Sequence, residues 1–100
     1  MWPMSVESET SVPQLFVLKQ NYPNPFNPST TIKYSLQNDG HVLLKIYNAL
    51  GQEVATLVDG NESAGYKSVV FNASGLGSGV YYCRLSANGK SMTKPMLLIK

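Results

Sequence analysis

The chain has 100 residues and a formal net charge of +2, a length that fits one small domain and excludes a multidomain enzyme within it. Hydrophobic residues make up 43% and charged residues 14% of the sequence, so the composition predicts a folded domain with a buried core. The single arginine, Arg84, and the mild net charge argue against a nucleic-acid-binding surface, which gathers many Lys and Arg side chains.

The charge is divided unevenly along the chain. Residues 1–62 sum to −3, whereas residues 63–100 sum to +5 and contain no acidic side chain. This basic third is interpreted either as a solvated face of spaced lysines or as a docking surface for an acidic partner.

One cysteine and one histidine limit the chemistry of the chain. Cys83 has no partner for an intrachain disulfide, and His41 would need carboxylates to complete a metal site. We therefore expect no metal and no cofactor. No run of 18 apolar residues occurs, so no transmembrane segment is expected, and the first residues lack the regions of a signal peptide. The segment is expected to be cytosolic, or to be cut from a longer chain whose signal lies upstream.

Residues 1–14 are rich in Ser, Glu, Thr and Pro and are expected to be a disordered linker or residues added for expression. Beyond them, short apolar runs recur about every ten residues between Gly, Asn, Asp and Pro, a spacing that predicts an antiparallel sandwich or barrel. Helical periodicity is absent.

The first predicted strands are residues 16–19 and 30–36, the second of which alternates between apolar and polar side chains. Asn38-Asp39-Gly40 predicts a tight hairpin turn with positive φ, so that residues 41–48 return beside 30–36. The side chains expected to point inward are Ile32, Tyr34, Leu36, Val42, Leu44 and Ile46.

Two further turns are expected in the middle of the chain. Residues 49–52 turn the chain into a strand at 53–58, and Asp59-Gly60-Asn61 turns it again before a strand at 66–72. That strand places Val69 and Phe71 on one face.

Three glycines within residues 75–79 predict a corner between two sheets, because no Lys-Ser/Thr pair and no helix follow to make a phosphate loop. The strand expected at 80–87 has Tyr81, Cys83 and Leu85 inward. Tyr81 precedes Cys83 by two residues, the spacing of a tyrosine corner in immunoglobulin-like sandwiches. Cys83 is then expected to be a small buried apolar residue.

Asn88-Gly89 predicts a tight turn into a last strand at 90–100. Pro95 confines that strand to an edge of its sheet or places a bulge in it, because proline cannot donate to the ladder. The end of this strand is apolar on both faces, since it consists of Met96, Leu97, Leu98 and Ile99. Together the elements predict an all-β fold, an immunoglobulin-like antiparallel β-sandwich of about seven strands.

Residues 20–31 contain three X-Pro steps and form a rigid elbow, because each proline fixes φ and extends the residue before it. This string, QNYPNPFNPSTT, resembles the entry motif of the C-terminal sorting domains of the type IX (Por) secretion system of Bacteroidetes. The resemblance continues through LKIYNALGQEVATLVDG, SAGYKSVVFNASGLGSGVYYCRL and KPMLLIK, so that residues 15–100 are identified as an immunoglobulin-like C-terminal sorting domain.

The motif residues that carry the resemblance are Asn24, Pro25, Phe26, Asn27, Pro28, Tyr47, Gly51, Gly79, Val80 and Tyr81. The immunoglobulin-like domain of flagellar hook-capping proteins shares the PNPF and IYN-LG-EV parts, but the KPMLLIK ending favours the sorting domain. Cys83 and Pro95 depart from the pattern, where an aromatic or aliphatic residue and a lysine would be more ordinary.

The resemblance implies a non-catalytic module at the C-terminus of a secreted cargo protein. After Sec export, such a domain is recognised in the periplasm by the outer-membrane type IX translocon. A sortase-like protease then commonly cleaves it and attaches the cargo to the cell surface. The recognised element would be the terminal strand region, which comprises Lys94, Met96, Leu97, Leu98, Ile99 and Lys100.

The residues themselves agree on one point, since an apolar edge strand flanked by lysines could add to a partner's sheet or fill a groove. Met96 and Leu98 would equally well close the core of the domain itself. Leu97 and Ile99 are therefore the more informative pair.

Two other classes of function compete with sorting. Catalysis is not expected, because Asp39 and Asp59 lie in predicted turns and His41 has no nucleophile motif beside it. A carbohydrate-binding or structural accessory module of a secreted enzyme is the alternative, since sandwich folds bind sugars on exposed aromatic side chains. The candidates are Trp2, Tyr22, Tyr47, Tyr66 and Tyr82, of which Tyr47 and Tyr82 face outward by alternation.

Overall fold

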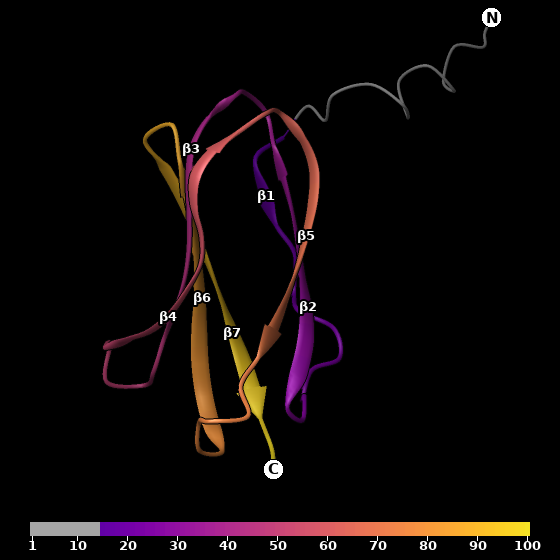
Figure 1. Cartoon of the computed structure of the whole chain (residues 1–100), viewed down its shortest axis with the longest axis vertical. Coiled ribbons are helices and arrows are strands. Elements are labelled where there is room, and N and C mark those ends of the chain that lie inside the picture. Colours follow the sequence, from indigo (N-terminus) through magenta and orange to yellow (C-terminus); the bar gives the residue numbers. More distant parts are fainter. Residues whose placement is uncertain (1–14) are drawn as a thin grey trace, which may run out of the picture.

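The computed structural model describes residues 15–100, and these residues form seven β-strands and no helix (Figure 1). The strands are β1 (Val17–Leu18), β2 (Ser29–Leu36), β3 (Gly40–Tyr47), β4 (Glu53–Glu62), β5 (Gly65–Asn72), β6 (Gly79–Ala87) and β7 (Lys90–Leu98). The all-β prediction of about seven strands is confirmed. The predicted linker of residues 1–14 lies outside the described residues.

The strands form two sheets that face one another. The three-stranded sheet has the order β1-β2-β5 and the four-stranded sheet the order β4-β3-β6-β7, and every neighbouring pair is antiparallel. Figure 1 shows the sheets as two layers, so the architecture is an antiparallel β-sandwich.

The core lies between the two sheets and is built from alternate residues of each strand, because successive side chains of a strand point to opposite faces. The predicted inward faces of β2, β3 and β6 are all buried, and Phe71 of β5 joins them while Val69 is half-buried. The buried apolar side chains are Leu18, Phe26, Ile32, Tyr34, Leu36, Val42, Leu44, Ile46, Phe71, Ala73, Tyr81, Cys83, Leu85, Ala87, Met96 and Leu98.

The predicted hairpin between residues 30–36 and 41–48 is wrong. β2 pairs with β1 and β5, whereas β3 pairs with β4 and β6, so the chain crosses from one sheet to the other at residues 37–39. Gly40 does not adopt the positive φ expected of a hairpin turn. Alternation specifies which face of a strand is buried, and strands that face each other across the core satisfy it as well as strands that lie side by side.

The predicted turn at Asp59-Gly60-Asn61 is also wrong, because β4 continues through these residues to Glu62. They pair with the start of β3, where Asp59 lies opposite Leu43 and Asn61 opposite His41. β4 is an edge strand whose outer side chains meet water, so polar residues there do not end the strand.

The remaining turns match the prediction. At the β3–β4 turn, Gly51 has a φ of 85°, and Asn48 Oδ1 accepts hydrogen bonds from the N–H groups of Leu50 and Gln52. At the β6–β7 turn, Asn88 and Gly89 have φ values of 52° and 78°, as a tight hairpin requires.

The glycine-rich corner at 75–79 joins β5 of one sheet to β6 of the other, as predicted. Tyr81 closes it, since its phenol Oη donates a hydrogen bond of 2.7 Å to the carbonyl oxygen of Gly77. This is the backbone contact expected of a tyrosine corner, and Cys83 two residues later is buried and free. The relation to immunoglobulin-like domains stays a prediction.

Two crossovers between the sheets meet at the end of the sandwich that is uppermost in Figure 1. The carboxylate of Asp39, before β3, accepts a hydrogen bond of 2.7 Å from the N–H of Ala64, before β5. Nearby, the carbonyl of Asp39 and the side chain of Asn88 approach, and a Cβ at Gly40 would overlap the Asn88 amide oxygen. Gly40 is thus required for close approach rather than for a turn.

Replacement of Gly40 by alanine is expected to lower the free energy of unfolding by about 1 kcal/mol, because the Asn88 side chain must move away. Gly60→Ala is the matched control, since Gly60 lies in a strand with open space around it. Urea titrations should show the loss only for Gly40→Ala, and Asn88→Gly in the same chain should remove it. Equal midpoints for Gly40→Ala and Gly60→Ala would contradict this role.

Stability is expected to fall at alkaline pH through Cys83. Burial raises the pKa of its thiol to about 12, whereas the thiol of the unfolded chain ionises near its ordinary pKa of about 8.5. Because the pKa of the thiol is higher in the folded chain than in the unfolded chain, the contribution of Cys83 to the free energy of unfolding is fully present below about pH 8.5. It is lost as the pH rises toward 12. Urea titrations from pH 7 to 11 should show a steeper decline for the natural chain than for Cys83→Ala. Parallel declines would refute the assignment.

Candidate functional site

The candidate site starts from β7, which is an edge strand of the four-stranded sheet, one of the two positions that Pro95 predicted. Leu97 directs its N–H and carbonyl away from β6 and toward residues 24–26. Pro95 lies two residues earlier on the same strand, so its nitrogen also faces away from β6. Pro95 therefore lacks an N–H only on the side that faces away from β6, so no hydrogen bond of the β6–β7 ladder is lost.

The elbow closes the edge of β7 with four hydrogen bonds. Asn24 Oδ1 accepts from the N–H of Leu97 at 2.9 Å. The N–H of Phe26 donates to the Leu97 carbonyl at 2.9 Å, and the Phe26 carbonyl accepts from the N–H of Ile99 at 3.0 Å. Gln20 Nε2 donates to the Pro95 carbonyl at 2.6 Å. Addition of a partner's strand along residues 95–99 would therefore require the elbow to leave.

The elbow is held in place by a buried polar network as well as by its prolines. Asn21 and Thr30 are buried; Asn21 Nδ2 donates to Thr30 Oγ1 at 3.0 Å and to the Pro23 carbonyl at 3.1 Å. Thr30 Oγ1 donates to the same carbonyl at 2.8 Å. The three X-Pro bonds of the segment are cis. The expected rigid elbow is thus tied to the first residues of β2.

Phe26 inserts its side chain between the sheets. It is almost fully buried, and its ring centroid lies 6.1 Å from that of Phe71 on β5. The carbonyl of Pro28 accepts a hydrogen bond from Ala73 just after β5. The predicted motif residues Pro25 and Asn27 are exposed between these contacts. The elbow therefore contacts β2, β5 and β7 at once and closes one end of the sandwich.

The four apolar residues among the predicted recognition residues divide into two pairs. Met96 and Leu98 are buried and complete the core, while Leu97 is 36% and Ile99 51% exposed. Lys94 follows the inward-facing register and is half-buried. Lys100 is held by the glycine corner, since its N–H donates to Ser78 Oγ at 2.9 Å and its Nζ to the Ser74 carbonyl.

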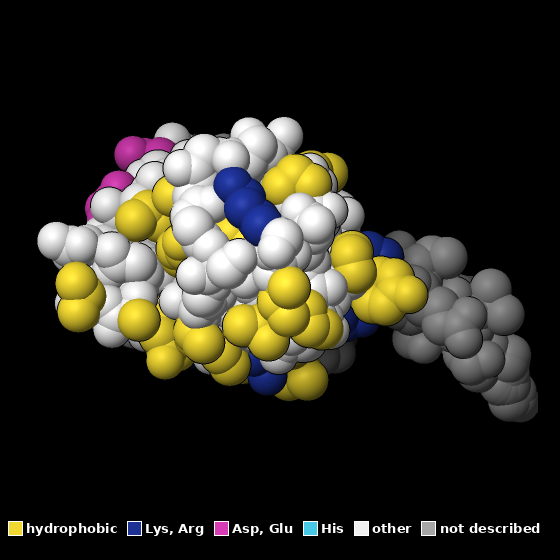
Figure 2. All heavy atoms as spheres, turned by 90° about the horizontal axis from the view of Figure 1, so that it is seen from below, with side chains coloured by type: hydrophobic (Ala, Val, Ile, Leu, Met, Phe, Trp, Pro, Cys, Tyr) yellow, Lys and Arg dark blue, Asp and Glu magenta, His cyan; other side chains and the backbone are white. Residues whose placement is uncertain are grey.

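Exposed apolar side chains continue from Leu97 across the outer face of the four-stranded sheet. Val80 lies opposite Leu97, and Tyr82 lies opposite Pro95. We call Val80, Tyr82, Leu97 and Ile99 the terminal patch; all four are exposed. Figure 2 views this end of the molecule and shows hydrophobic side chains spread over it, with acidic side chains confined to one side.

The other motif residues have structural positions. Gly79 opens β6 with a φ of 151°, Gly51 shapes the β3–β4 turn, and Tyr81 forms the tyrosine corner. Tyr47 lies opposite Tyr82 on the outer face, as alternation predicted. The sequence did not predict that Gln20, Asn21 and Thr30 hold the elbow in place. Their signal is the occurrence of amide and hydroxyl side chains in a segment that forms few backbone hydrogen bonds of its own.

The fold and the site define an all-β sandwich module whose distinctive region is a closed terminal edge with an exposed apolar patch beside it. Among residues 15–100, no three His, Cys, Asp or Glu side chains gather into a possible metal site. No helix in this part of the chain is long and apolar enough to cross a membrane.

The model of the secretion system C-terminal sorting domain family matches residues 20–100. The chain therefore belongs to this family, as the motifs predicted. Domains of this family are sorting signals for type IX secretion, recognised by its machinery, on cargo that passes the periplasm to become secreted or surface-located. They are in general not catalysts. No curated protein matches the chain.

Asn24→Ala is expected to open the closed edge. The Leu97 N–H loses its acceptor, so stability should fall by about 1 kcal/mol and the Leu97 amide should exchange with solvent faster. Tyr22→Ala is the control from the same segment, because its side chain is 81% exposed and only its backbone pairs with Thr31. Hydrogen exchange followed by NMR provides the measurement. An unchanged Leu97 rate in Asn24→Ala would show that the edge is not held by this contact.

Proposed function

We propose that the terminal patch is the surface that the outer-membrane type IX translocon recognises. The observation that carries this proposal is the division of the terminal segment: the backbone edge of residues 95–99 is bonded to the elbow, while Leu97 and Ile99 stay exposed. Recognition then depends on side chains of a preformed surface, which costs less ordering entropy than recognition of a flexible tail.

The elbow and the glycine corner act as supports in this proposal. Phe26 and Asn24 hold the strand from one side, and Ser78 and Ser74 hold Lys100 from the other. The patch is thereby presented on a rigid element, as a precise binding surface requires.

The finer steps are also part of the proposal. The domain follows a Sec-exported cargo, performs no catalysis itself, and is removed by a sortase-like protease when the cargo is attached to the cell surface. The family membership supports this sequence of events.

The export test uses the chain of residues 1–100 fused to the C-terminus of a Sec-exported reporter, in a host with a type IX system. The natural fusion should reach the cell surface, and Leu97→Glu with Ile99→Glu should reduce surface reporter at least about tenfold, because two charges then occupy an apolar contact. Loss of about 10.9 kDa from the surface form would support cleavage.

The matched control is Tyr66→Glu with Val70→Glu, because these side chains are 66% and 63% exposed on the outer face of the other sheet. Both double variants should keep the natural melting temperature within a few degrees. Periplasmic retention of the natural fusion would overturn the function, and normal export of the Leu97 and Ile99 variant would overturn the patch.

A further inference from the structure

Arg84 lies at the centre of the outer face of the four-stranded sheet. The sequence contains no other arginine, and in register Arg84 stands opposite Lys45 on β3 and Thr93 on β7. It lines two shallow depressions of about 300 Å³ each and a more enclosed one of about 240 Å³. Its side chain is therefore the shared border of these hollows.

Arg84 has no acidic partner within residues 15–100, whereas two side chains of β3 each contact a carboxylate. His41 Nε2 lies 2.9 Å from Asp59 Oδ1, and Lys45 Nζ lies 3.1 Å from Glu53 Oε1. β6 and β7 contain no acidic residue. The guanidinium, with five N–H donors, is thus free of a carboxylate within the described residues.

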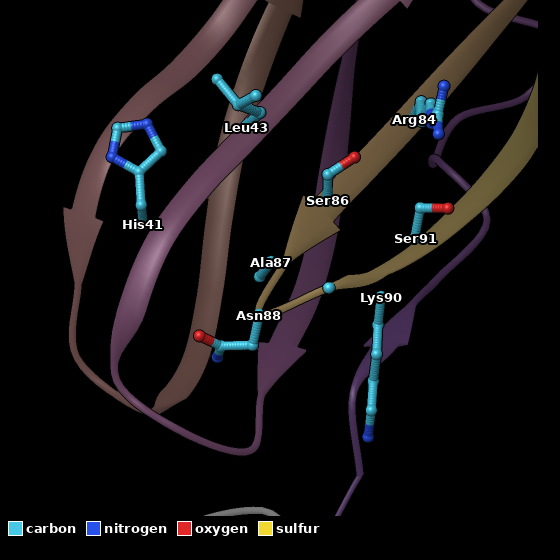
Figure 3. A pocket seen from close by; sticks show the side chains of 9 residues that line it. His41, Leu43, Arg84, Ser86, Ala87, Asn88, Lys90 and Ser91 are labelled. Atoms are coloured by element: carbon cyan, nitrogen blue, oxygen red, sulfur yellow. The ribbon is translucent and has the colours of Figure 1, made fainter.

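Residues with hydroxyl side chains neighbour Arg84 on the same face. Thr93 lies opposite Arg84, and two pairs further along the strands Ser86 lies opposite Ser91. Figure 3 shows Arg84, Ser86 and Ser91 projecting from one side of the sheet. A carboxylate can accept two parallel hydrogen bonds from a guanidinium, and neutral hydroxyl donors fit beside it without repulsion.

The residue types next to Arg84 favour a protein as the source of that carboxylate. Tyr47 and Tyr82 lie opposite each other on neighbouring strands, within the hollow that Arg84 borders, and Tyr and Arg are the types that contribute most to protein interfaces. The two larger hollows are shallow, whereas small-molecule sites enclose most of their ligand. Tyr82 also belongs to the terminal patch, so the two surfaces are continuous.

We propose that the outer face of β3, β6 and β7 docks an acidic protein surface, with Arg84 binding an Asp or Glu carboxylate of the partner. The inference rests on the proposed function, because it takes the partner to be a component of the type IX machinery. Charge complementarity supports it: residues 63–100 carry five basic and no acidic side chains, and Arg84 is a cation of that segment left unpaired at the centre of the face.

The test places Arg84→Glu and Arg84→Lys in the reporter fusion of residues 1–100. Arg84→Glu should lower surface reporter at least about tenfold, since two acidic groups would face each other. Arg84→Lys should give an intermediate loss, because it keeps the charge without the forked geometry. Lys33→Glu is the charge-matched control: Lys33 is exposed on the outer face of the three-stranded sheet, and its variant should be exported normally.

A second measurement does not depend on the mutant's export. A photo-crosslinking residue at Thr93 should give a protein-sized adduct in cells with the type IX system, and the same residue at Ser68, on the opposite outer face, should not. The adduct should disappear in Arg84→Glu.

Normal export of Arg84→Glu, or equal losses for Arg84→Glu and Lys33→Glu, would overturn the docking surface while leaving the sorting function intact. Periplasmic retention of the natural fusion would overturn both. Saturable binding of glucuronate to the chain, lost in Arg84→Glu while export persists, would replace the protein partner by an acidic sugar.

Discussion

The hydrogen bonds between the elbow and β7 are the contact on which the rest of this end of the molecule depends. They join Asn24 and Phe26 to Leu97 and Ile99, residues more than 70 positions apart in the sequence. An open edge strand exposes unpaired backbone groups that invite pairing with other chains. Here the elbow occupies those groups over residues 95–99, and the Phe26 side chain fills the space between the sheets behind them.

This closure determines what the outside can recognise. With the backbone occupied and Met96 and Leu98 buried, the exposed features of the terminal segment include the apolar side chains of Leu97 and Ile99. They continue into Val80 and Tyr82 and then into the surroundings of Arg84. The proposed recognition surface is thus one continuous face of the four-stranded sheet, supported from behind by the core.

The burial pattern of individual strands could be predicted from the sequence, because alternation depends only on local backbone geometry. Strand β6 is an example, because it buries Tyr81, Cys83 and Leu85 and exposes Tyr82 and Arg84. The partner of a strand could not be predicted in the same way: Ile32 and Leu44 are equally buried whether β2 and β3 lie side by side or face each other. Asn24 was found through the family motif, but its bond to Leu97 joins residues 73 positions apart, which no local pattern reveals.

The place of β7 in the fold also has a consequence during synthesis. Until the ribosome has added Met96 and Leu98, the core lacks two of its buried side chains, and the elbow has no strand to bond. A nascent chain that stops at the β6–β7 turn has neither the closed edge nor Leu97 and Ile99 in place. The surface that we propose is recognised therefore exists only in chains translated through β7 and Ile99, so the fold itself distinguishes them from chains that stop before that strand.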